Sequence, residues 1–315
     1  MRNVVFLFTT LLFSQLMHAE EALEPYQKVN GISGNLSSVG SDTLASLMTS
    51  WVEEFNDIYP NINVQVQASG SSTATPALVE ETAQFGPMSR SMRVREVEAF
   101  ERQHGYKPTA LRVAIDAIGI FVHRDNTIRG LNFTQIDSIF SSTLRCGAKE
   151  PVQNWQQLGI EQEWAKRRLQ LFGRNSVSGT YGYFKKNALC GGDFKRNVNE
   201  QPGSASVVQS VASSINSIGY SGVGYLVSGV RLLPIANQGN DFVEASRDNI
   251  LSGVYPLSRF LYVYVNKNPT KPLGALEAEF IRYIFSEQGQ ALVSKNGYVP
   301  ISYKMAQAEL EKVGL

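Results

Sequence analysis

Two long apolar stretches limit the folds open to this chain more than any other feature. The first, Leu111–His123 (LRVAIDAIGIFVH), is rich in β-branched residues and is interrupted by Asp116. Its length exceeds that of an ordinary strand, so we expect it to leave one domain and enter another. Much later in the chain, Phe260–Val265 (FLYVYV) predicts a second long strand. Together they indicate two domains joined by two crossing strands.

The order of these strands predicts which segments form each domain. The simplest arrangement places residues 20–116 and 257–315 in a first, discontinuous lobe that the C-terminal segment completes. Residues 117–256 then form an inserted second lobe. The length of 315 residues agrees with this division, because single hydrophobic cores seldom grow beyond ~250–300 residues.

Helical and extended patterns alternate along the rest of the chain. After Ser41 or Asp42, apolar residues recur at helical spacing as Leu44, Leu47, Met48, Trp51, Val52 and Phe55. This helix is expected to end near Tyr59-Pro60. The other expected elements are a strand at Ile62–Val66 and helices from near Thr75-Pro76 and over Arg93–His104, Tyr181–Leu189, Ala275–Phe285 and Gly289–Lys295. Strands that alternate with helices predict α/β domains.

Residues 1–19 are typical of a removable export signal. Arg2 precedes the apolar run Val4–Leu16, which is too short to span a bilayer, and Met17-His18-Ala19 follows. Removing the signal takes Arg2 from the 29 basic residues and leaves them equal in number to the 28 acidic ones. A chain with no charge excess has no general attraction for nucleic acid or an anionic membrane, so we expect an exported, soluble protein.

The two cysteines, Cys146 and Cys190, both lie in the predicted inserted lobe. An even number of cysteines in an exported chain favours a disulfide between them, and two buried thiols are the alternative. The cysteines, His104 and His123 show no metal-ligand spacing such as C-x-x-C or H-E-x-x-H. We therefore expect no metal and no cofactor.

Small hydroxyl residues and glycines gather in four short segments near the ends of predicted strands. The segments are Gly40-Ser41-Asp42-Thr43, Ser69-Gly70-Ser71-Ser72-Thr73, Gly86-Pro87-Met88-Ser89-Arg90 and Gly173-Arg174-Asn175-Ser176-Val177-Ser178-Gly179-Thr180. Helix N-termini offer unpaired N–H groups, glycine lets the backbone approach a ligand, and hydroxyls add donors. Such turns bind a small oxyanion without excess charge. Arg174 adds a forked, permanently charged donor.

The alternative is that these residues are ordinary helix caps. None of the segments is a P-loop, because no Gly-Lys-Ser/Thr ending occurs.

The fourth segment also carries a family resemblance. Arg174-x-x-x-Ser178-Gly179-Thr180 resembles the phosphate-clamping Arg-x-x-x-Ser-Gly-Thr of the PstS-like periplasmic phosphate-binding proteins of phosphate ABC importers, which are type II periplasmic binding proteins. Further similarity lies in Gly40–Thr43, Gly70–Ser72, Ile218–Tyr220, Ser286–Gln290 and Asn296–Pro300. The resemblance covers nearly all of the mature chain. It implies two Rossmann-like α/β lobes joined by two crossing strands, with the ligand in the cleft between them.

The resemblance also implies the residues of a phosphate site. They are Ser41, Asp42, Thr43, Ser71, Ser72, Ser89, Asp116, Arg174, Ser178, Gly179 and Thr180. The chain departs from the family in one respect, because some members place an aspartate in the third segment, where this chain has Ser89 and Arg90. That carboxylate accepts the proton of hydrogen phosphate and disfavours sulfate, which has no proton to donate at neutral pH.

Another acceptor is therefore needed, and the sequence offers Asp42 first and Asp116 second. Either could instead be structural, Asp42 as a helix cap and Asp116 as the partner of an arginine. Arg90 either faces the ligand or forms an ion pair at the surface, and Tyr181 is expected to pack rather than to bind.

The leading hypothesis for function is a monomeric, non-enzymatic periplasmic protein. Its two lobes would close on inorganic phosphate and deliver it to the permease of an ABC importer. One alternative is a carrier of sulfate, molybdate or another oxyanion. A second is a periplasmic phosphatase or serine hydrolase, although the chain lacks a Gly-x-Ser-x-Gly elbow. A third is an exported phosphate sensor or adhesion factor of the same fold.

Overall fold

The computed structural model describes residues 22–315, so the predicted signal at residues 1–19 lies outside the described residues. Eleven strands are assigned: β1 (Gly34–Val39), β2 (Ile62–Gln67), β3 (Phe85–Met88), β4 (Thr109–His123), β5 (Leu131–Asn132), β6 (Gln170–Arg174), β7 (Val198–Gln201), β8 (Ser217–Gly222), β9 (Val230–Leu233), β10 (Ile235–Ala236) and β11 (Ser258–Val265). The helices are α1 (Ala45–Ile58), α2 (Ala74–Val79), α3 (Val94–His104), α4 (Phe133–Phe140), α5 (Gly179–Ala188), α6 (Ser204–Ala212), α7 (Arg247–Leu251), α8 (Ala275–Ile284), α9 (Glu287–Lys295) and α10 (Tyr303–Glu311). Short 3₁₀ turns are η1 (Asp42–Leu44), η2 (Ser71–Thr73), η3 (Trp155–Leu158), η4 (Glu163–Lys166) and η5 (Val223–Tyr225).

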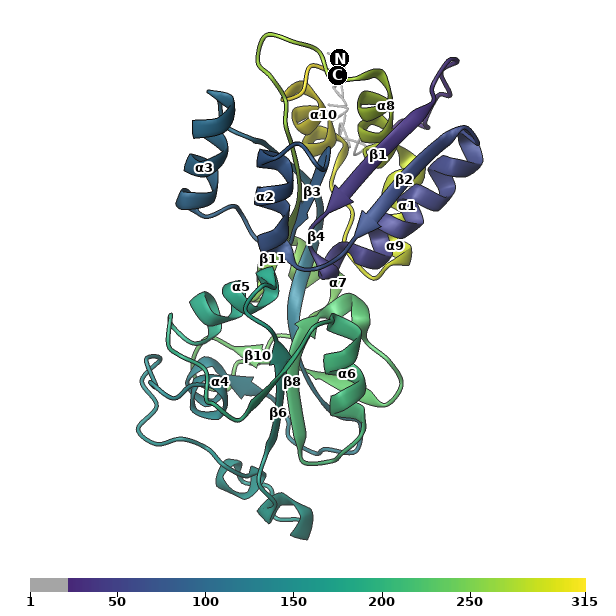
Figure 1. Cartoon of the computed structure of the whole chain (residues 1–315). Helices are drawn as coiled ribbons and strands as arrows, with labels where there is room; N and C mark the ends of the chain where they lie inside the picture. The colour runs from purple at the N-terminus through teal and green to yellow at the C-terminus, as the bar shows by residue number, and fades with distance from the viewer. Residues whose placement is uncertain (1–21) are drawn as a thin grey trace, which may run out of the picture.

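The elements form two α/β lobes placed end to end, with β4 passing from one to the other (Figure 1). The main sheet has the strand order β2-β1-β3-β11-β4-β8-β6-β7, and β9 also pairs with β4. Parallel pairs such as β1–β2 and β6–β8 lie on the two sides of the antiparallel pair β11–β4. This is the α/β class that the sequence predicted.

The long strand predicted at Leu111–His123 is confirmed as β4. Residues Thr109–Ala117 pair with β11, whereas Ile118–His123 pair with β8 and β9, so β4 changes partners between Ala117 and Ile118. Every residue from Val113 to Val122 is buried. A strand covered on both faces needs such a nearly continuous apolar run.

The predicted first helix is confirmed as α1, and its apolar face joins the N-terminal and C-terminal segments. Leu47, Met48, Trp51 and Phe55 are at most 1% exposed. The Trp51 indole N–H donates to the carbonyl of Gly289 in α9 at 2.8 Å. The helices predicted near the C-terminus are confirmed as α8 and α9, and both pack against α1.

The second helix is confirmed near Thr75-Pro76, because α2 begins at Ala74, directly after η2. One detail of the polar segments differs from the sequence prediction. Gly86–Met88 are not a turn, because they belong to the fully buried strand β3. Since β3 lies between β1 and β11, its backbone is held extended, and Pro87 contributes only its carbonyl to the loop after β1. Only Ser89 and Arg90 remain as a turn.

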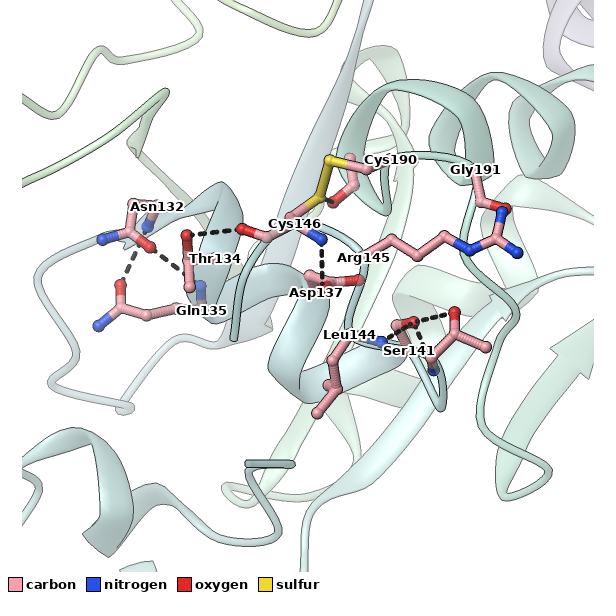
Figure 2. The surroundings of a disulfide bond; sticks show 12 residues. Asn132, Thr134, Gln135, Asp137, Ser141, Leu144, Arg145, Cys146, Cys190 and Gly191 are labelled. Atoms are coloured by element: carbon pink, nitrogen blue, oxygen red, sulfur yellow. Dashed lines mark hydrogen bonds between the residues drawn. A yellow bond between two sulfur atoms is a disulfide. The ribbon is translucent and has the colours of Figure 1, made fainter. Parts of the chain in front are cut away.

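The predicted disulfide is confirmed between Cys146 and Cys190, so the alternative of two buried thiols is wrong. Figure 2 shows that the bridge joins the loop after α4 to the end of α5. The N–H of Cys146 donates to Asp137 Oδ2 at 2.9 Å, and Arg145 Nη1 donates to the carbonyl of Gly191 at 3.2 Å. These contacts anchor an otherwise irregular loop to the second lobe.

Among residues 22–315, no group of three or more His, Cys, Asp or Glu side chains is arranged to hold a metal ion. No helix in the same range is long and apolar enough to cross a membrane.

Candidate functional site

The first three polar segments meet at the same edge of the sheet, where β1, β2 and β3 end. The N–H of Ser41 donates to the carbonyl of Pro87 at 2.8 Å, and the N–H of Gly70 donates to the carbonyl of Gly40 at 2.7 Å. Parallel strands carry their following loops at one edge, which is why segments far apart in sequence converge here.

Ser71 and Ser89 form the floor of this cluster. Their hydroxyl oxygens lie 3.2 Å apart, and the N–H of Ser89 donates to the Ser71 hydroxyl at 3.0 Å. Both residues are fully buried. Buried hydroxyls are held by partners that fix their rotamers, so these two serines present a fixed polar surface.

The fourth segment reaches the same place from the other lobe, between β6 and α5. The hydroxyl oxygens of Thr43 and Thr180 lie 3.0 Å apart, and the N–H of Ser72 donates to the carbonyl of Val177 at 3.1 Å. A Cβ added to Gly179 would lie 2.4 Å from the Ser71 hydroxyl. Glycine is therefore required for the start of α5 to approach the first three segments, and all four segments come together as the sequence predicted.

Ser178 has a structural role at this helix start. Its hydroxyl accepts the N–H of Thr180 at 3.1 Å, which is the geometry of an N-cap. Both residues are buried. The cap orients the first turn of α5, whose N–H groups and positive dipole end then face the junction of the lobes.

Arg174 lies at the end of β6 and is only 1% exposed. Nη1 donates to the Ser204 hydroxyl at 2.6 Å and lies 3.1 Å from Asp42 Oδ2, and Nη2 donates to the carbonyl of Pro202 at 2.9 Å. Its Nε finds no hydrogen-bond partner in the described part of the chain. Burial lowers the pKa of Arg174, and the neighbouring Asp42 opposes that shift.

Asp42 bridges the two lobes. Its Oδ2 accepts the N–H of Ser204, the first residue of α6, at 2.8 Å and also faces Arg174. Its side chain is 21% exposed. The sequence left open whether Asp42 is a cap or a ligand contact, and the structure places its carboxylate at the N-terminus of a helix in the opposite lobe.

Asp116 and Arg259 form a fully buried pair on the two crossing strands. They are directly opposite each other in the β4–β11 ladder, and Asp116 Oδ2 accepts from Arg259 Nε at 2.9 Å and Nη2 at 2.7 Å. Asp116 Oδ1 and Arg259 Nη1 have no hydrogen-bond partner among residues 22–315. Burial raises the pKa of Asp116, and the charge of Arg259 opposes that shift.

Arg259 is the residue that sequence reasoning missed. Its Nη2 also donates to the Thr180 hydroxyl at 2.9 Å, so it connects Asp116 to the start of α5. The sequence did hold a signal, because Arg259 is a charged residue at the start of an apolar strand, just as Asp116 is a charged residue within one. Only the strand register shows that the two charges face each other.

Other residues near the site support the loops. The Tyr225 hydroxyl donates to the carbonyl of Asp42 at 2.9 Å, and the Tyr298 hydroxyl donates to the carbonyl of Thr43.

Arg90 is 8% exposed and forms a salt bridge with Glu96 at 2.6 Å. It also donates to the carbonyl of Ser91 at 3.0 Å and to the Ser72 hydroxyl at 3.2 Å, so it is paired but not at the open surface.

Tyr181, His104 and His123 pack against other residues. Tyr181 packs on Phe194 with ring centroids 4.6 Å apart, as the sequence predicted. His104 packs on Phe100 at 4.3 Å, and His123 is held near Asp125. The site therefore offers hydroxyls, backbone N–H groups, two buried guanidinium groups and one buried carboxylate, a set that suits a small anion carrying one proton.

Comparison with known proteins places this geometry in a family. Residues 27–288 match the family model described as a PBP superfamily domain. The chain is 59% identical over 297 residues to the phosphate-binding protein PstS of Pseudomonas aeruginosa, covering 94% of this chain and 92% of that protein. It is 28% identical over 275 residues to PstS of Bacillus subtilis, covering 86% of this chain and 82% of that protein.

A solved structure shares the fold. A phosphate ABC transporter substrate-binding protein with bound phosphate from Clostridium perfringens superposes with a TM-score of 0.71 at 24% identity, over 85% of this chain and 100% of that one. The family match and the 59% identity to the Pseudomonas protein extend over both lobes. The chain belongs to the PBP superfamily, in the family of the phosphate-binding protein PstS.

Proposed function

We propose that this protein binds hydrogen phosphate where the four polar segments meet, and that the two lobes close on it. Ten buried side-chain polar atoms lack a hydrogen-bond partner among residues 22–315, and the observation that carries this proposal is that three of them belong to the charged pairs at the junction of the lobes. Asp116 Oδ1 is an acceptor, and Arg174 Nε and Arg259 Nη1 are donors. A buried unpaired polar group costs ~1–3 kcal/mol, and more when it is charged, so such a set is expected where a ligand supplies the partners.

Hydrogen phosphate has the matching chemistry. Its one O–H can donate to Asp116 Oδ1, and its other oxygens accept from the two guanidinium groups. Sulfate has no proton at neutral pH, so it would leave the buried carboxylate unpaired and would be repelled by its charge. The same residues thus favour phosphate over other oxyanions, by the rule that an unpaired buried polar group rejects the wrong ligand.

Asp116 suits the role of proton acceptor better than Asp42. Asp42 Oδ2 already accepts the N–H of Ser204 and faces Arg174, and its side chain is 21% exposed. Asp116 is fully buried, and its Oδ1 has no partner among residues 22–315. Burial raises its pKa, and the charge of Arg259 opposes that shift and favours the charged carboxylate that an acceptor needs. The two roles weighed from sequence, arginine partner and ligand contact, therefore coexist in Asp116.

The other site residues serve as donors in this proposal. The hydroxyls of Ser41, Thr43, Ser71, Ser72, Ser89 and Thr180 line the meeting point, while Ser178 caps α5 and Gly179 lets its N–H groups come close. Asp42 acts indirectly, by holding Arg174 in place and joining the lobes. Donors from both lobes converge on one anion, so binding shifts the protein toward the closed form.

The wider role follows from the relatives. The Pseudomonas protein is named a phosphate-binding protein, and the Clostridium protein is a substrate-binding protein of a phosphate ABC transporter. We extend this to an exported periplasmic monomer that delivers phosphate to an importer permease and catalyses no reaction. We also propose lobe limits at 116/117 and 256/257; β4 changes partners one residue after the first limit, between Ala117 and Ile118.

Calorimetric titration with phosphate and with sulfate, at two pH values, tests the proposal. Phosphate should bind at one site per chain and at least ~100-fold more tightly than sulfate at pH 8, which is about 2.7 kcal/mol of discrimination. Equal affinities would favour the alternative of a general oxyanion carrier. Steady hydrolysis of a chromogenic phosphate ester by the purified protein would overturn the non-enzymatic role.

A further inference from the structure

The two sides of the junction between the lobes differ in charge. On one side a groove of about 980 Å³ runs between α2 and α3 of the first lobe and α5 of the second. Its charged lining consists of Arg93, Arg95, Lys185, Lys186, Glu80 and Glu96. A neighbouring hollow of about 590 Å³ shares Arg93 and Lys186 with it. We call the two together the α3–α5 groove.

The α3–α5 groove leads to the candidate site. The second hollow is lined by Arg259, whose Nη2 donates to the Thr180 hydroxyl, and by Arg90, whose Nη2 donates to the Ser72 hydroxyl. Ser72 and Val177, which join the two lobes by a 3.1 Å hydrogen bond, line the first hollow. An anion in the groove is therefore next to the residues that close over the site.

Much of the positive charge in the groove is not neutralised. Arg90 pairs with Glu96 at 2.6 Å, and Lys185 pairs with Asp193 at 2.7 Å. Within the described residues, no carboxylate lies within 4.0 Å of the charged nitrogens of Arg93, Arg95 or Lys186. Burial and the positive charges of Arg90 and Arg95 lower the pKa of Arg93, and the charge of Glu96 opposes that shift. The protein thus holds several like charges together at this place.

The opposite side of the junction is closed and nearly neutral. It is formed by η5 and the residues after it, facing the segment that follows α9. The hydroxyls of Tyr225 and Tyr298 there donate to backbone carbonyls of Asp42 and Thr43. Leu226 is 51% exposed, and the one cation, Lys295, lies 3.7 Å from Glu54. Apolar and tyrosine side chains there offer nothing to attract an anion.

We propose that the α3–α5 groove is the entrance through which a doubly charged tetrahedral oxyanion reaches the site, and that Arg93, Arg95 and Lys186 attract it. This inference rests on the proposed function. A chain whose mature charge is zero has no long-range attraction for an anion, so a local field must supply it. Clefts lined by one sign of charge raise association rates by 10- to 1000-fold, and salt screens the effect.

The test replaces two of the three cations and measures association kinetics with inorganic phosphate. The substitution Leu226→Cys provides an attachment point for an environment-sensitive dye on the opposite side of the junction. The fluorescence of this dye reports closure in stopped flow. In the labelled protein, Arg93→Gln/Lys186→Gln should lower the association rate constant about three- to tenfold at 10 mM ionic strength, where the screening length is ~30 Å. The difference should fall below about twofold at 0.5 M salt, and the dissociation rate should not change.

A matched control removes the same charge far from the groove. Arg167→Gln/Lys304→Gln neutralises two exposed cations, one beyond η4 in the second lobe and one in α10 of the first. It should leave the association rate unchanged. An unchanged association rate constant in Arg93→Gln/Lys186→Gln would overturn the proposal that the groove is the entrance. A loss of affinity that arises from faster dissociation alone would overturn it as well. Absence of phosphate binding in the unsubstituted protein would instead overturn the proposed function, so the two failures are distinct.

Discussion

Two carboxylate–arginine pairs lie at the junction of the lobes, one partly and one fully buried, and they differ in what surrounds them. Asp42 and Arg174 come from opposite lobes and meet at 3.1 Å, whereas Asp116 and Arg259 are neighbours on β4 and β11 and meet at 2.7 Å. In the first pair, Ser204 and Pro202 make further contacts with Asp42 and with the two Nη atoms of Arg174, and Arg174 Nε lacks a partner among residues 22–315. The second keeps an acceptor and a donor without partners among residues 22–315.

This difference indicates two roles, one in holding the lobes together and one in recognising the ligand. Asp42 has its partners in the opposite lobe, so the strength of its interactions depends on how the lobes are placed. The Asp116–Arg259 pair is set by the strand register and stays assembled in either arrangement of the lobes. The Asp116–Arg259 pair has an unpartnered acceptor within the described residues, so it can distinguish one ligand from another. The Asp42 carboxylate already has its partners across the junction, so its contribution is to favour closure. The following experiments test this division, from the largest expected effect on affinity to the smallest.

Arg174→Ala should cause the largest loss. It removes the donor Nε from the site and also the contact with Asp42, and loss of one partner from a buried hydrogen-bonded charge pair costs ~2–5 kcal/mol. Phosphate affinity measured by calorimetry should fall about 100-fold or more. Arg167→Ala, an exposed arginine of the same lobe, is the control and should bind normally. If Arg174→Ala binds phosphate about as tightly as the unsubstituted protein does, Arg174 does not contact the ligand.

Asp116→Asn should cost less affinity but change selectivity. The substitution keeps the shape of the side chain and loses its charge, so phosphate binding should weaken by ~10- to 100-fold, the worth of a hydrogen bond to a charged group. Sulfate binding should strengthen, because an amide can donate to it.

The matched control for Asp116→Asn is Asp137→Asn. Asp137 is another buried aspartate with a raised pKa and an unpartnered Oδ1 within the described chain, but it lies in α4. That variant should leave both affinities unchanged. If Asp116→Asn lowers the affinities for phosphate and sulfate equally, Asp116 does not accept the ligand proton.

The pH dependence of selectivity tests the same carboxylate without substitution. Burial raises the pKa of Asp116 above its ordinary value of about 3.9, so as pH falls it becomes protonated earlier than an exposed aspartate. The protonated form can donate to sulfate and is no longer repelled by it. The phosphate-to-sulfate affinity ratio, followed by competition from pH 8 down to pH 5, should therefore decrease, by at most about tenfold per pH unit. In Asp116→Asn the residual change reports only the protonation of phosphate itself.

Much of the fold could be predicted from the sequence because its signals are local. The uninterrupted apolar run of β4 and the 3.6-residue spacing in α1 each lie within one stretch of chain. The third polar segment was misjudged because glycine and proline usually indicate a turn, whereas neighbours on both sides hold Gly86–Met88 in a strand. Tertiary contacts outweighed local preference there.

The site was predicted less completely, for a physical reason. Hydroxyl-rich turns are visible in sequence, but the partner of Asp116 lies 143 positions away and is set by the register of β4 and β11. Ser204 likewise reaches Arg174 only because α6 begins beside β6. The residues that complete each charged pair are defined by packing, and one sequence holds no record of which distant segments pack together.

Asp42→Asn should have a smaller effect than Asp116→Asn. The amide oxygen still accepts the N–H of Ser204, but the attraction to Arg174 is lost, so the closed form becomes less populated. A fall in the competent fraction weakens the affinity for every ligand by the same factor. We expect phosphate and sulfate to lose about three- to tenfold each, with their ratio unchanged, since exposed or partly exposed ion pairs contribute ~1 kcal/mol.

Small-angle scattering supplies the second measurement for Asp42→Asn. The ligand-free variant should have a larger radius of gyration than the unsubstituted protein, and saturating phosphate should remove the difference. A changed phosphate-to-sulfate ratio would show that Asp42 contacts the ligand, and the division between the two pairs would then be wrong.

Removing the disulfide should have the smallest effect on binding, because it touches neither pair. The bridge spans 44 positions within the second lobe, so the chain-entropy model gives it about 4 kcal/mol through restriction of the unfolded chain. Cys146→Ser/Cys190→Ser should lower the free energy of unfolding of this lobe by ~2–4 kcal/mol in denaturant titration. Phosphate affinity should stay within about twofold at temperatures where the variant is folded, since the start of α5 is held by Ser178, Gly179 and Thr180 rather than by the bridge at its end. A large loss of phosphate affinity would mean that α5 needs the bridge at its C-terminal end to keep its first turn in position. The disulfide would then share with Asp42 the role of holding the site together.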